Sequence, residues 1–254
     1  MTQCAAVREQ LLQSGVENAE MEARMLCEAL SGEALTCAVE RRCGGYPLQY
    51  ILGEWGFWRE EYEVSEHCLV PRPDTEHLVE KAIAMLPNGA RFLDLCTGSG
   101  CVAISTLASR PDTTALAVDL FEQTLALAER NARKNGVADR VEFACADVLC
   151  APTIQGPFDA ILSNPPYIPD AVVPTLSREV QHEPSAALCG GKDGLDFYRA
   201  IVEKWRALLS PNGFVLFEIG YDQADALRAL AAEHGLSVEV FRDYGGNDRV
   251  VLLR

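Results

Sequence analysis

The stretch Arg91-Phe92-Leu93-Asp94-Leu95-Cys96-Thr97-Gly98-Ser99-Gly100, followed by Cys101-Val102-Ala103-Ile104, decides the fold. An apolar strand that leads through a glycine-rich turn into a helix is the first half of a nucleotide-binding crevice, because glycines let a ligand lie against the backbone. Position 103 is alanine, so the third glycine of the dinucleotide fingerprint G-x-G-x-x-G is absent. The turn therefore predicts a nucleotide-like ligand but does not specify a dinucleotide.

Strands and helices alternate around this stretch, which predicts parallel strands with right-handed crossovers. We expect strands at about 91–95, 114–119, 141–146, 158–163 and 213–218, and helices at about 76–86, 100–109, 121–135, 193–209 and 222–234. Two further strands at 237–241 and 249–253 flank the turn-rich segment 244–248. Because no helix separates them, we expect an antiparallel hairpin at the sheet edge.

The chain upstream of the sheet has a different character. Residues 1–52 show apolar positions at three-to-four spacing, broken at Gly15 and Gly32, which predicts a small bundle of three or four helices. Its role is recognition of a partner or simply packing. Residues 53–72 are aromatic and β-branched and predict a hairpin linker. We expect residues 73–254 to form one α/β domain that carries the ligand site.

Three aspartates lie at the ends of three successive strands. Asp94 precedes the glycine turn, where a carboxylate suits a cationic amino-acid moiety and repels a pyrophosphate. Asp119 is placed to bind ribose hydroxyls, and Asp147, with Val148 beside it, ends the third strand. Each aspartate alone is typical of a helix cap or a turn. Together they favour a ligand with an ammonium, a ribose and an adenine amino group, and S-adenosylmethionine has all three.

Asn164-Pro165-Pro166-Tyr167 follows the apolar strand at 158–163 and so lies where open α/β sheets bind ligands. The two prolines stiffen the loop and remove N–H donors, which leaves the Asn164 side-chain oxygen and the proline carbonyls as acceptors. Such a loop suits a planar group that carries an NH₂. A plain proline-rich turn is the alternative interpretation.

Composition narrows the class of protein. The 254 residues include 22 basic and 37 acidic side chains, a net charge of −15, which disfavours a nucleic-acid substrate and suits a basic protein partner or solubility alone. Ten cysteines and four histidines are scattered without metal-ligand spacing, so we expect reduced thiols and no metal. No apolar run approaches ~18 residues and no signal-peptide order is visible, which predicts a cytoplasmic protein without membrane segments.

The chain resembles class I S-adenosylmethionine-dependent methyltransferases, and more closely the PrmC/HemK family of release factor N5-glutamine methyltransferases. The resemblance spans nearly the whole length. It rests on the Asp94–Gly100 turn, the Asn-Pro-Pro-Tyr motif and the flanking segments, which are Pro47–Gly53, Phe57-Trp58, Pro71–Glu76, Glu183-Pro184, Gly190-Gly191, Arg242–Tyr244 and Asp248–Val250. Two departures are visible: Cys96 stands where many members have glycine, and Val148 where some have an aromatic residue.

This resemblance implies a Rossmann-like, mostly parallel seven-stranded sheet with a small N-terminal helical domain, and S-adenosylmethionine as the cofactor. It implies that cofactor contacts are made by Asp94, Cys96, Thr97, Gly98, Ser99, Gly100, Asp119, Asp147, Val148 and Asn164, and catalysis by Asn164, Pro165, Pro166 and Tyr167. It also hints that Arg72 and the 183–194 segment border the substrate channel.

The implied reaction is methyl transfer to the side-chain amide nitrogen of the glutamine in the Gly-Gly-Gln motif of class I release factors, by a monomer that does not bind nucleic acid directly. Asn164 and the Pro165 carbonyl would accept hydrogen bonds from the amide. The motif also occurs in adenine N6-methyltransferases, so a ribosomal-protein glutamine or an adenine remains an alternative substrate. A non-catalytic cofactor-binding module and a dehydrogenase are alternatives from other classes.

Overall fold

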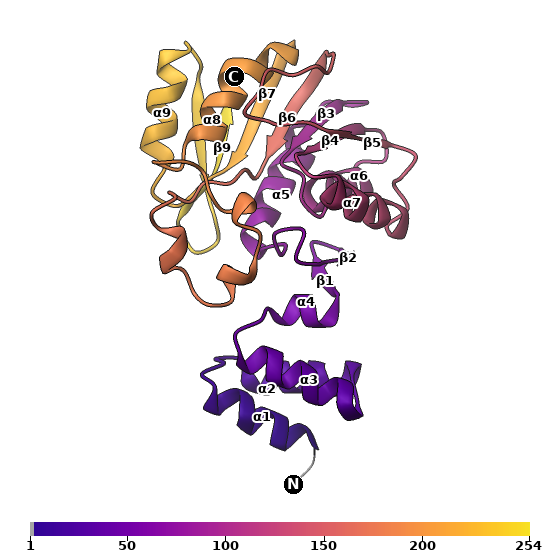
Figure 1. Ribbon diagram of the computed structural model, residues 1–254. Helices are drawn as coiled ribbons and strands as arrows, with labels where there is room; N and C mark the ends of the chain where they lie inside the picture. Colours follow the sequence, from indigo (N-terminus) through magenta and orange to yellow (C-terminus); the bar gives the residue numbers. More distant parts are fainter. Residues whose placement is uncertain (1–2) are drawn as a thin grey trace.

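A computed structural model describes residues 3–254 and shows a small helical bundle beside a larger α/β unit (Figure 1). The bundle contains α1 (Gln3–Gln13), α2 (Ala19–Ala29), α3 (Gly32–Cys43) and the short α4 (Leu48–Leu52). The three-to-four spacing of its apolar residues brings Leu11, Leu26 and Leu35 together in a core of their own.

A two-stranded antiparallel hairpin, β1 (Glu54–Phe57) and β2 (Glu60–Glu63), follows the bundle. Its aromatic side chains Phe57 and Tyr62 pack into the core of the larger unit rather than into that of the bundle. Asn131 fastens the hairpin further, because its side-chain amide accepts a hydrogen bond from the Glu63 N–H at 2.7 Å and donates to the Glu63 carbonyl at 3.0 Å. The hairpin is thus part of the larger unit in packing terms.

Arg42 of α3 joins the bundle to the segment between β6 and α8. Its guanidinium group is buried and donates to Glu22 at 3.0 Å (Nη2 to Oε1) and to Glu179 at 3.1 Å (Nη2 to Oε2). The rings of Tyr46 and His182 lie against each other nearby, with their centroids 5.3 Å apart. These two contacts form what we call the bundle clasp, which consists of Glu22, Arg42, Tyr46, Glu179 and His182.

The larger unit is built on a seven-stranded sheet with the order β5-β4-β3-β6-β7-β9-β8. The strands are β3 (Arg91–Leu95), β4 (Thr114–Asp119), β5 (Val141–Cys145), β6 (Phe158–Ser163), β7 (Leu209–Glu218), β8 (Val238–Arg242) and β9 (Asp248–Leu253). Strand β9 is antiparallel to both of its neighbours, β7 and β8, whereas the pairs β3–β4, β3–β6, β4–β5 and β6–β7 are parallel. The predicted mostly parallel, seven-stranded α/β fold is therefore confirmed.

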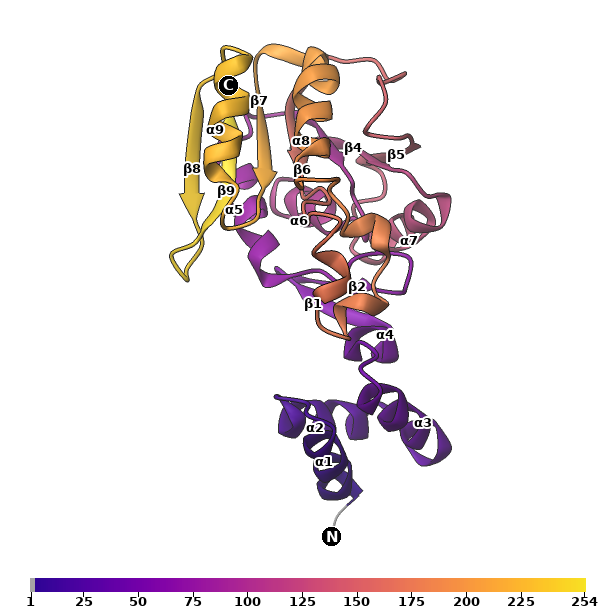
Figure 2. The ribbon, with the colours of Figure 1, turned by 60° about the vertical axis from the view of Figure 1, so that its left-hand side comes forward.

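Helices cover both faces of the sheet (Figures 1 and 2). One face carries α5 (Glu76–Met85), α6 (Cys101–Ser109) and α7 (Glu122–Lys134), and the other carries α8 (Asp196–Ala200) and α9 (Ala224–Glu233). Alternate residues of a strand point to opposite faces, so Phe92 packs in the first core and Leu93 in the second. Burial on both faces explains the near-continuous apolar runs of these strands.

Two predicted elements start three or more residues away from their observed positions. The predicted helix at 193–209 begins at Asp196. It changes type along its length, because α8 is followed by a π-helical turn (Ile201–Trp205) and then by a 3-10 turn (Arg206–Leu208). Strand β7 starts at Leu209 instead of 213, with an irregular register opposite the start of β6. The predicted antiparallel hairpin forms at one edge of the sheet, with β9 beside β7 and β8 outermost.

Within residues 3–254, no helix combines the length and the apolarity needed to cross a bilayer.

Candidate active site

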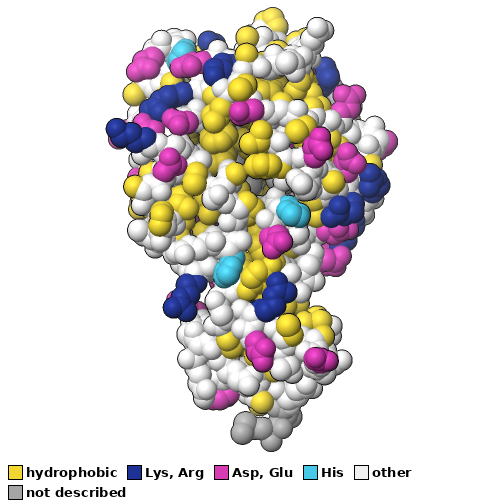
Figure 3. All heavy atoms as spheres, in the orientation of Figure 1, with side chains coloured by type: hydrophobic (Ala, Val, Ile, Leu, Met, Phe, Trp, Pro, Cys, Tyr) yellow, Lys and Arg dark blue, Asp and Glu magenta, His cyan; other side chains and the backbone are white. Residues whose placement is uncertain are grey.

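A cavity of about 410 Å³ opens at the carboxyl ends of β3, β4, β5 and β6. Hydrophobic side chains gather on this face of the larger unit (Figure 3). The volume lies within the range of ~300–1,000 Å³ that is usual for small-molecule sites. The cavity is therefore where this type of sheet places its ligand.

The glycine turn after β3 forms the floor of the cavity. Gly98 has a φ of +56°, and a Cβ added there would meet no atom within 4 Å, so a ligand has space to approach the backbone. Gly100 serves packing instead, because a Cβ at its φ of +83° would lie 2.7 Å from the Ile104 side chain. Cys96 also has a positive φ, +62°, a conformation in which a side chain is strained. Cys96, Thr97, Gly98 and Ser99 line the cavity, whereas Gly100 does not.

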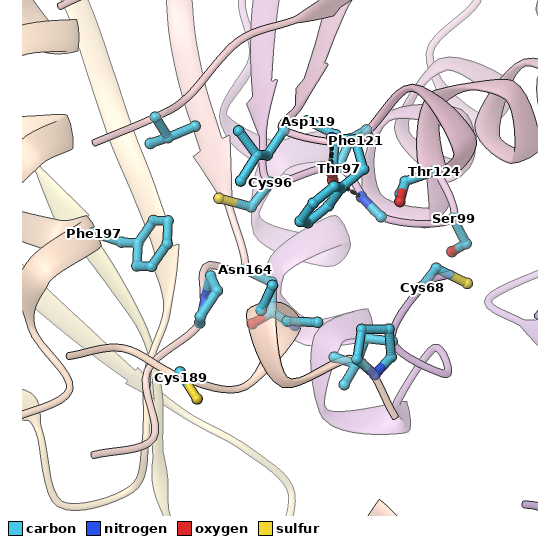
Figure 4. Close-up of a pocket in the computed structure, with 18 of the residues that line it drawn as sticks. Cys68, Cys96, Thr97, Ser99, Asp119, Phe121, Thr124, Asn164, Cys189 and Phe197 are labelled. Atoms are coloured by element: carbon cyan, nitrogen blue, oxygen red, sulfur yellow. Dashed lines mark hydrogen bonds between the residues drawn. The ribbon is translucent and has the colours of Figure 1, made fainter. Parts of the chain in front are cut away.

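Asp119, at the end of β4, both shapes the turn and faces the cavity. Its Oδ2 accepts a hydrogen bond from the Gly98 N–H at 3.0 Å, and its Oδ1 accepts one from the Phe121 N–H at 3.3 Å (Figure 4). Burial raises the pKa of the carboxyl group, while the backbone N–H donors oppose this shift. A carboxylate held by two backbone donors at a cavity wall still has lone pairs available for ligand hydroxyls.

Asp94 does not line the cavity, so its predicted contact with an ammonium group stays a prediction. Its carboxylate is 1% exposed, and its Oδ2 accepts hydrogen bonds from the Thr97 hydroxyl at 2.6 Å and the Ala103 N–H at 3.1 Å. The side chain lies behind the turn because alternation along β3 directs it toward the same core as Phe92. Asp94 therefore holds the glycine turn against the start of α6.

The Asp94→Asn substitution is expected to reduce the loss of stability that occurs as pH rises. Burial raises the pKa of Asp94 to about 7, so this group stabilises the fold fully below its ordinary pKa and loses that contribution as pH rises through about 7. Asparagine cannot ionise, and its oxygen can accept the same two hydrogen bonds. Between pH 5 and pH 8, the free energy of unfolding of the wild type should therefore fall by about 2 to 3 kcal/mol more than that of the variant.

Urea unfolding at both pH values measures this difference, with the exposed Asp139→Asn as the matched control. An equal change in wild type and Asp94→Asn between the two pH values would show that Asp94 does not titrate in this range.

Asp147 and Val148 follow β5 and line the same cavity. Asp147 accepts a hydrogen bond from the Leu149 N–H at 2.8 Å, which orders the turn. Val148 is buried and belongs to the second core, and its carbonyl accepts a hydrogen bond from the Trp205 indole at 2.9 Å. The apolar Val148 side chain thus provides a fixed wall beside a polar group.

Asn164 stands at the end of β6, on the opposite side of the cavity from Thr124, Ser99 and Cys68 (Figure 4). Its Nδ2 donates to the Thr75 hydroxyl oxygen at 3.0 Å, and Asn164, Thr75 and Pro166 all line the cavity. Because the amide nitrogen is bound to the protein, the amide oxygen remains as the acceptor that Asn164 can offer to a ligand.

Pro165 and Tyr167 do not line the cavity. Pro165 is buried, and Tyr167 packs against the second core. Gln223 holds this part of the loop, because its Nε2 donates to the Tyr167 carbonyl at 3.0 Å and to the Gly194 carbonyl at 3.2 Å. A Cβ on Gly190 would lie 2.8 Å from the Pro166 oxygen, so the 188–191 segment packs directly on the motif.

Several cavity residues were not singled out by the sequence. Thr75, Phe121 and Phe197 line the cavity from distant parts of the chain. Thr75 lies in the Pro71–Glu76 segment, and the resemblance of that segment to the family was the sequence feature that pointed toward this residue. Arg72, Pro184 and Gly191 also line the cavity, as the resemblance hinted, and Arg72 forms an ion pair with Glu183.

Among the described residues, no group of three or more His, Cys, Asp or Glu side chains is arranged to hold a metal ion.

Comparisons with known proteins agree with this geometry. A family model described as methyltransferase small domain matches residues 75–186. The chain is 43% identical over 225 residues to the release factor glutamine methyltransferase of Rhodospirillum rubrum, covering 87% of this chain and 69% of that protein. It is 37% identical over an alignment of 276 residues to the protein of the same name from Agrobacterium fabrum, covering 98% and 95%.

The fold is shared more widely. A solved structure of a ribosomal protein L11 methylase from Lactobacillus delbrueckii subsp. bulgaricus matches with a TM-score of 0.53 and 20% identity, over 72% of this chain and 79% of that one. That likeness concerns the fold alone. With the sheet, the glycine turn and the Asn-Pro-Pro-Tyr loop in place, and with relatives that match over most of their length, the chain belongs to the S-adenosylmethionine-dependent family of release factor glutamine methyltransferases.

Proposed function

We propose that this protein transfers a methyl group from S-adenosylmethionine to the side-chain amide nitrogen of the glutamine in the Gly-Gly-Gln motif of class I peptide chain release factors. The observation that carries the proposal is the orientation of Asn164. Its Nδ2 is bound to Thr75 at 3.0 Å, which leaves its amide oxygen as an acceptor at the cavity wall. An acceptor without a competing donor suits an amide NH₂ group.

The residues present fit the cofactor. Gly98 leaves room for a ligand against the backbone, and the Asp119 carboxylate is placed for ribose hydroxyls. Val148 and Phe121 supply apolar surface near Asp119 for an adenine ring. When bound, S-adenosylmethionine supplies an electrophilic methyl group on a sulfonium.

The chain's own part in the reaction is to position the substrate amide. A glutamine amide nitrogen is a weak nucleophile because its lone pair is delocalised into the carbonyl. Asn164 Oδ1 at the cavity wall would accept one of its N–H bonds, fix its orientation and stabilise the positive charge that develops on nitrogen. The Pro165 carbonyl, to which no backbone N–H among residues 3–254 donates, is the second acceptor in this proposal; because Pro165 does not line the cavity, the loop would have to move to bring this carbonyl to the substrate. We assign no general base, since the alkylated nitrogen is acidic enough to lose its proton readily.

The N-terminal bundle at 1–52 and the hairpin at 53–72 serve in this proposal to present the release factor to the catalytic domain at 73–254. The bundle clasp supports this role, because it connects the bundle to the segment that contributes Pro184 and Gly191 to the cavity wall. A protein substrate is also consistent with a monomer that has an open face.

The second candidate substrate is a glutamine of a ribosomal protein, and adenine in nucleic acid is a more distant one. All three substrates present a planar NH₂, so Asn164 does not separate them. The names of the relatives favour a release factor, and a net charge of −15 opposes a polyanionic substrate.

Mass spectrometry of a class I release factor after incubation with this protein and S-adenosylmethionine tests the proposal. We expect a gain of one methyl group on the Gly-Gly-Gln glutamine and no gain when that glutamine is replaced by alanine. If the protein binds S-adenosylmethionine but methylates a ribosomal protein or adenine in place of the release factor, the proposed substrate is wrong.

A further inference from the structure

Glu218 is a buried carboxyl group to which the proposed reaction assigns no role. It ends β7, whose neighbour β6 is paired in parallel register up to Ser163 and Phe217. Glu218 and Asn164 therefore each lie one residue beyond a paired position, at the same edge of the sheet. Glu218 is only 1% exposed to solvent.

The Thr75 hydroxyl lies between Glu218 and Asn164. Its oxygen accepts the Asn164 Nδ2 donor at 3.0 Å, and the Thr75 side chain neighbours the Glu218 carboxyl group, whose pKa it lowers. Thr75 is itself 2% exposed, so water does not compete for these contacts. The three side chains form a short chain that ends at the cavity wall.

We infer that Glu218 is a positioning residue, which fixes the direction of the Thr75 hydroxyl and through it the orientation of the Asn164 amide. A threonine hydroxyl has one proton, and an ionised carboxylate only accepts. When Thr75 donates to Glu218, it can only accept from Asn164, which must then offer Nδ2. The amide oxygen is left to face the cavity, and this is the orientation that binding of a substrate NH₂ requires.

The protonated form of Glu218 permits the opposite arrangement. A carboxylic acid can donate to Thr75, which frees the threonine proton to point at the Asn164 oxygen. The Asn164 amide can then turn over and present its own NH₂ to the substrate NH₂, so two donors face each other. Ionised Glu218 therefore selects the active amide orientation.

The surroundings of Glu218 place its titration in the working range of pH. Burial raises the pKa of Glu218 to about 7, and the neighbouring Thr75, Arg249 and Tyr167 side chains oppose that rise. The nearby Asp74 charge raises the Glu218 pKa further. The Glu218 charge in turn raises the pKa values of the buried Tyr198 and Cys101.

Two observations argue against a purely structural role for Glu218. Arg249 does not neutralise it through hydrogen bonds, because its donors reach Asp243 at 3.2 Å, the Ile219 carbonyl at 3.2 Å and Asp74 at 3.4 Å. Glu218 Oε2 has no hydrogen-bond partner among residues 3–254. A carboxylate that only held the fold together would be fully hydrogen-bonded.

The inference rests on the proposed function, and its test compares kcat and KM for release-factor methylation between pH 6 and pH 9. In the wild type we expect kcat to fall as pH is lowered through about 7. In Glu218→Gln, whose amide can donate to Thr75, we expect kcat to fall about 10- to 100-fold with an unchanged KM for S-adenosylmethionine and without the pH dependence near 7. The exposed Glu239→Gln, which also removes one negative charge from the sheet, is the matched control and should behave as wild type.

Thr75 variants test the same chain of contacts independently, including the case in which Glu218→Gln fails to fold. Thr75→Val should lose activity and pH dependence as Glu218→Gln does, whereas Thr75→Ser, which keeps the hydroxyl, should retain both. The double variant should lose no more than either single variant, because both remove one pathway. Additive losses, or wild-type pH dependence in Glu218→Gln or Thr75→Val, would overturn the inference.

A second readout separates this inference from the proposed function. The side-chain amide resonances of Asn164 should shift with a midpoint near pH 7 in the wild type and not in Glu218→Gln or Thr75→Val, whatever the substrate is. Absence of release-factor methylation by the wild type rejects the proposed function alone, and an Asn164 signal that does not respond to pH rejects the role of Glu218.

Discussion

Asn164→Ala is expected to lower kcat by about 10²- to 10³-fold, the usual loss when one preorganised hydrogen-bonding group at a reacting centre is removed. Alanine keeps the β6 loop geometry but offers neither an acceptor to the substrate amide nor a donor to Thr75. Since one neutral hydrogen bond contributes about 1 kcal/mol, the Kd for S-adenosylmethionine should change by less than about tenfold. Single-turnover kinetics with a release factor and cofactor titration measure the two quantities.

Asn135→Ala provides the control for Asn164→Ala, because Asn135 lies at the end of α7 and its amide donates to the Glu61 carbonyl at 3.0 Å, away from the cavity residues. Its kcat should equal that of the wild type. An Asn164→Ala enzyme that is folded and still turns over at the wild-type rate would refute the proposed role of the amide oxygen.

Arg42→Ala is expected to destabilise the protein by about 3 to 5 kcal/mol, because it leaves the Glu22 carboxylate buried without its partner. The side chains of Arg42 and Glu22 are only 8% and 9% exposed, so solvent cannot replace the lost contact. Urea unfolding followed by circular dichroism gives the free energy of unfolding.

Arg24→Ala is the matched comparison for Arg42→Ala, since Arg24 and Glu28 form an ion pair of the same chemistry with side chains 78% and 67% exposed. Removing it should cost at most about 1 kcal/mol. Replacing Arg42 and Glu22 together by apolar residues of similar volume should recover most of the loss. Equal costs for Arg42→Ala and Arg24→Ala would show that burial of the Arg42 pair has no energetic consequence.

Local patterns predicted the parts of the fold that local physics determines. Strands β3 and β6 could be predicted from their short apolar runs, because hydrophobic periodicity is visible within a few residues. The turn between β3 and α6 could be predicted from its glycines, because a positive φ favours glycine. The position of β9 between β7 and β8 leaves no such trace, since the choice between two neighbouring strand slots depends on the packing of the whole sheet.

The candidate site divides in the same way. The cavity positions of Asn164 and Asp119 were predictable because Asp119 ends β4 and Asn164 follows β6, and these strand ends must lie at the ligand edge of the sheet. Asp94 was assigned to the ligand because the pattern gives the strand end but not the face to which the side chain turns, and the structure directs it into the core. Thr75 contacts Asn164 across 89 residues, and no spacing rule connects positions so far apart.

The bundle clasp makes the cavity wall and the packing of the N-terminal helices energetically interdependent. Glu179 lies in the same segment as Pro184 and Gly191, so displacement of this segment by a bound protein must either break the contact with Arg42 or move the bundle with it. Part of the binding free energy would then be spent at the contact between the bundle and this segment, away from the cavity. In the proposed function, a substitution in the bundle core, at Leu26 for instance, is therefore expected to change the affinity for a protein substrate although Leu26 does not line the cavity.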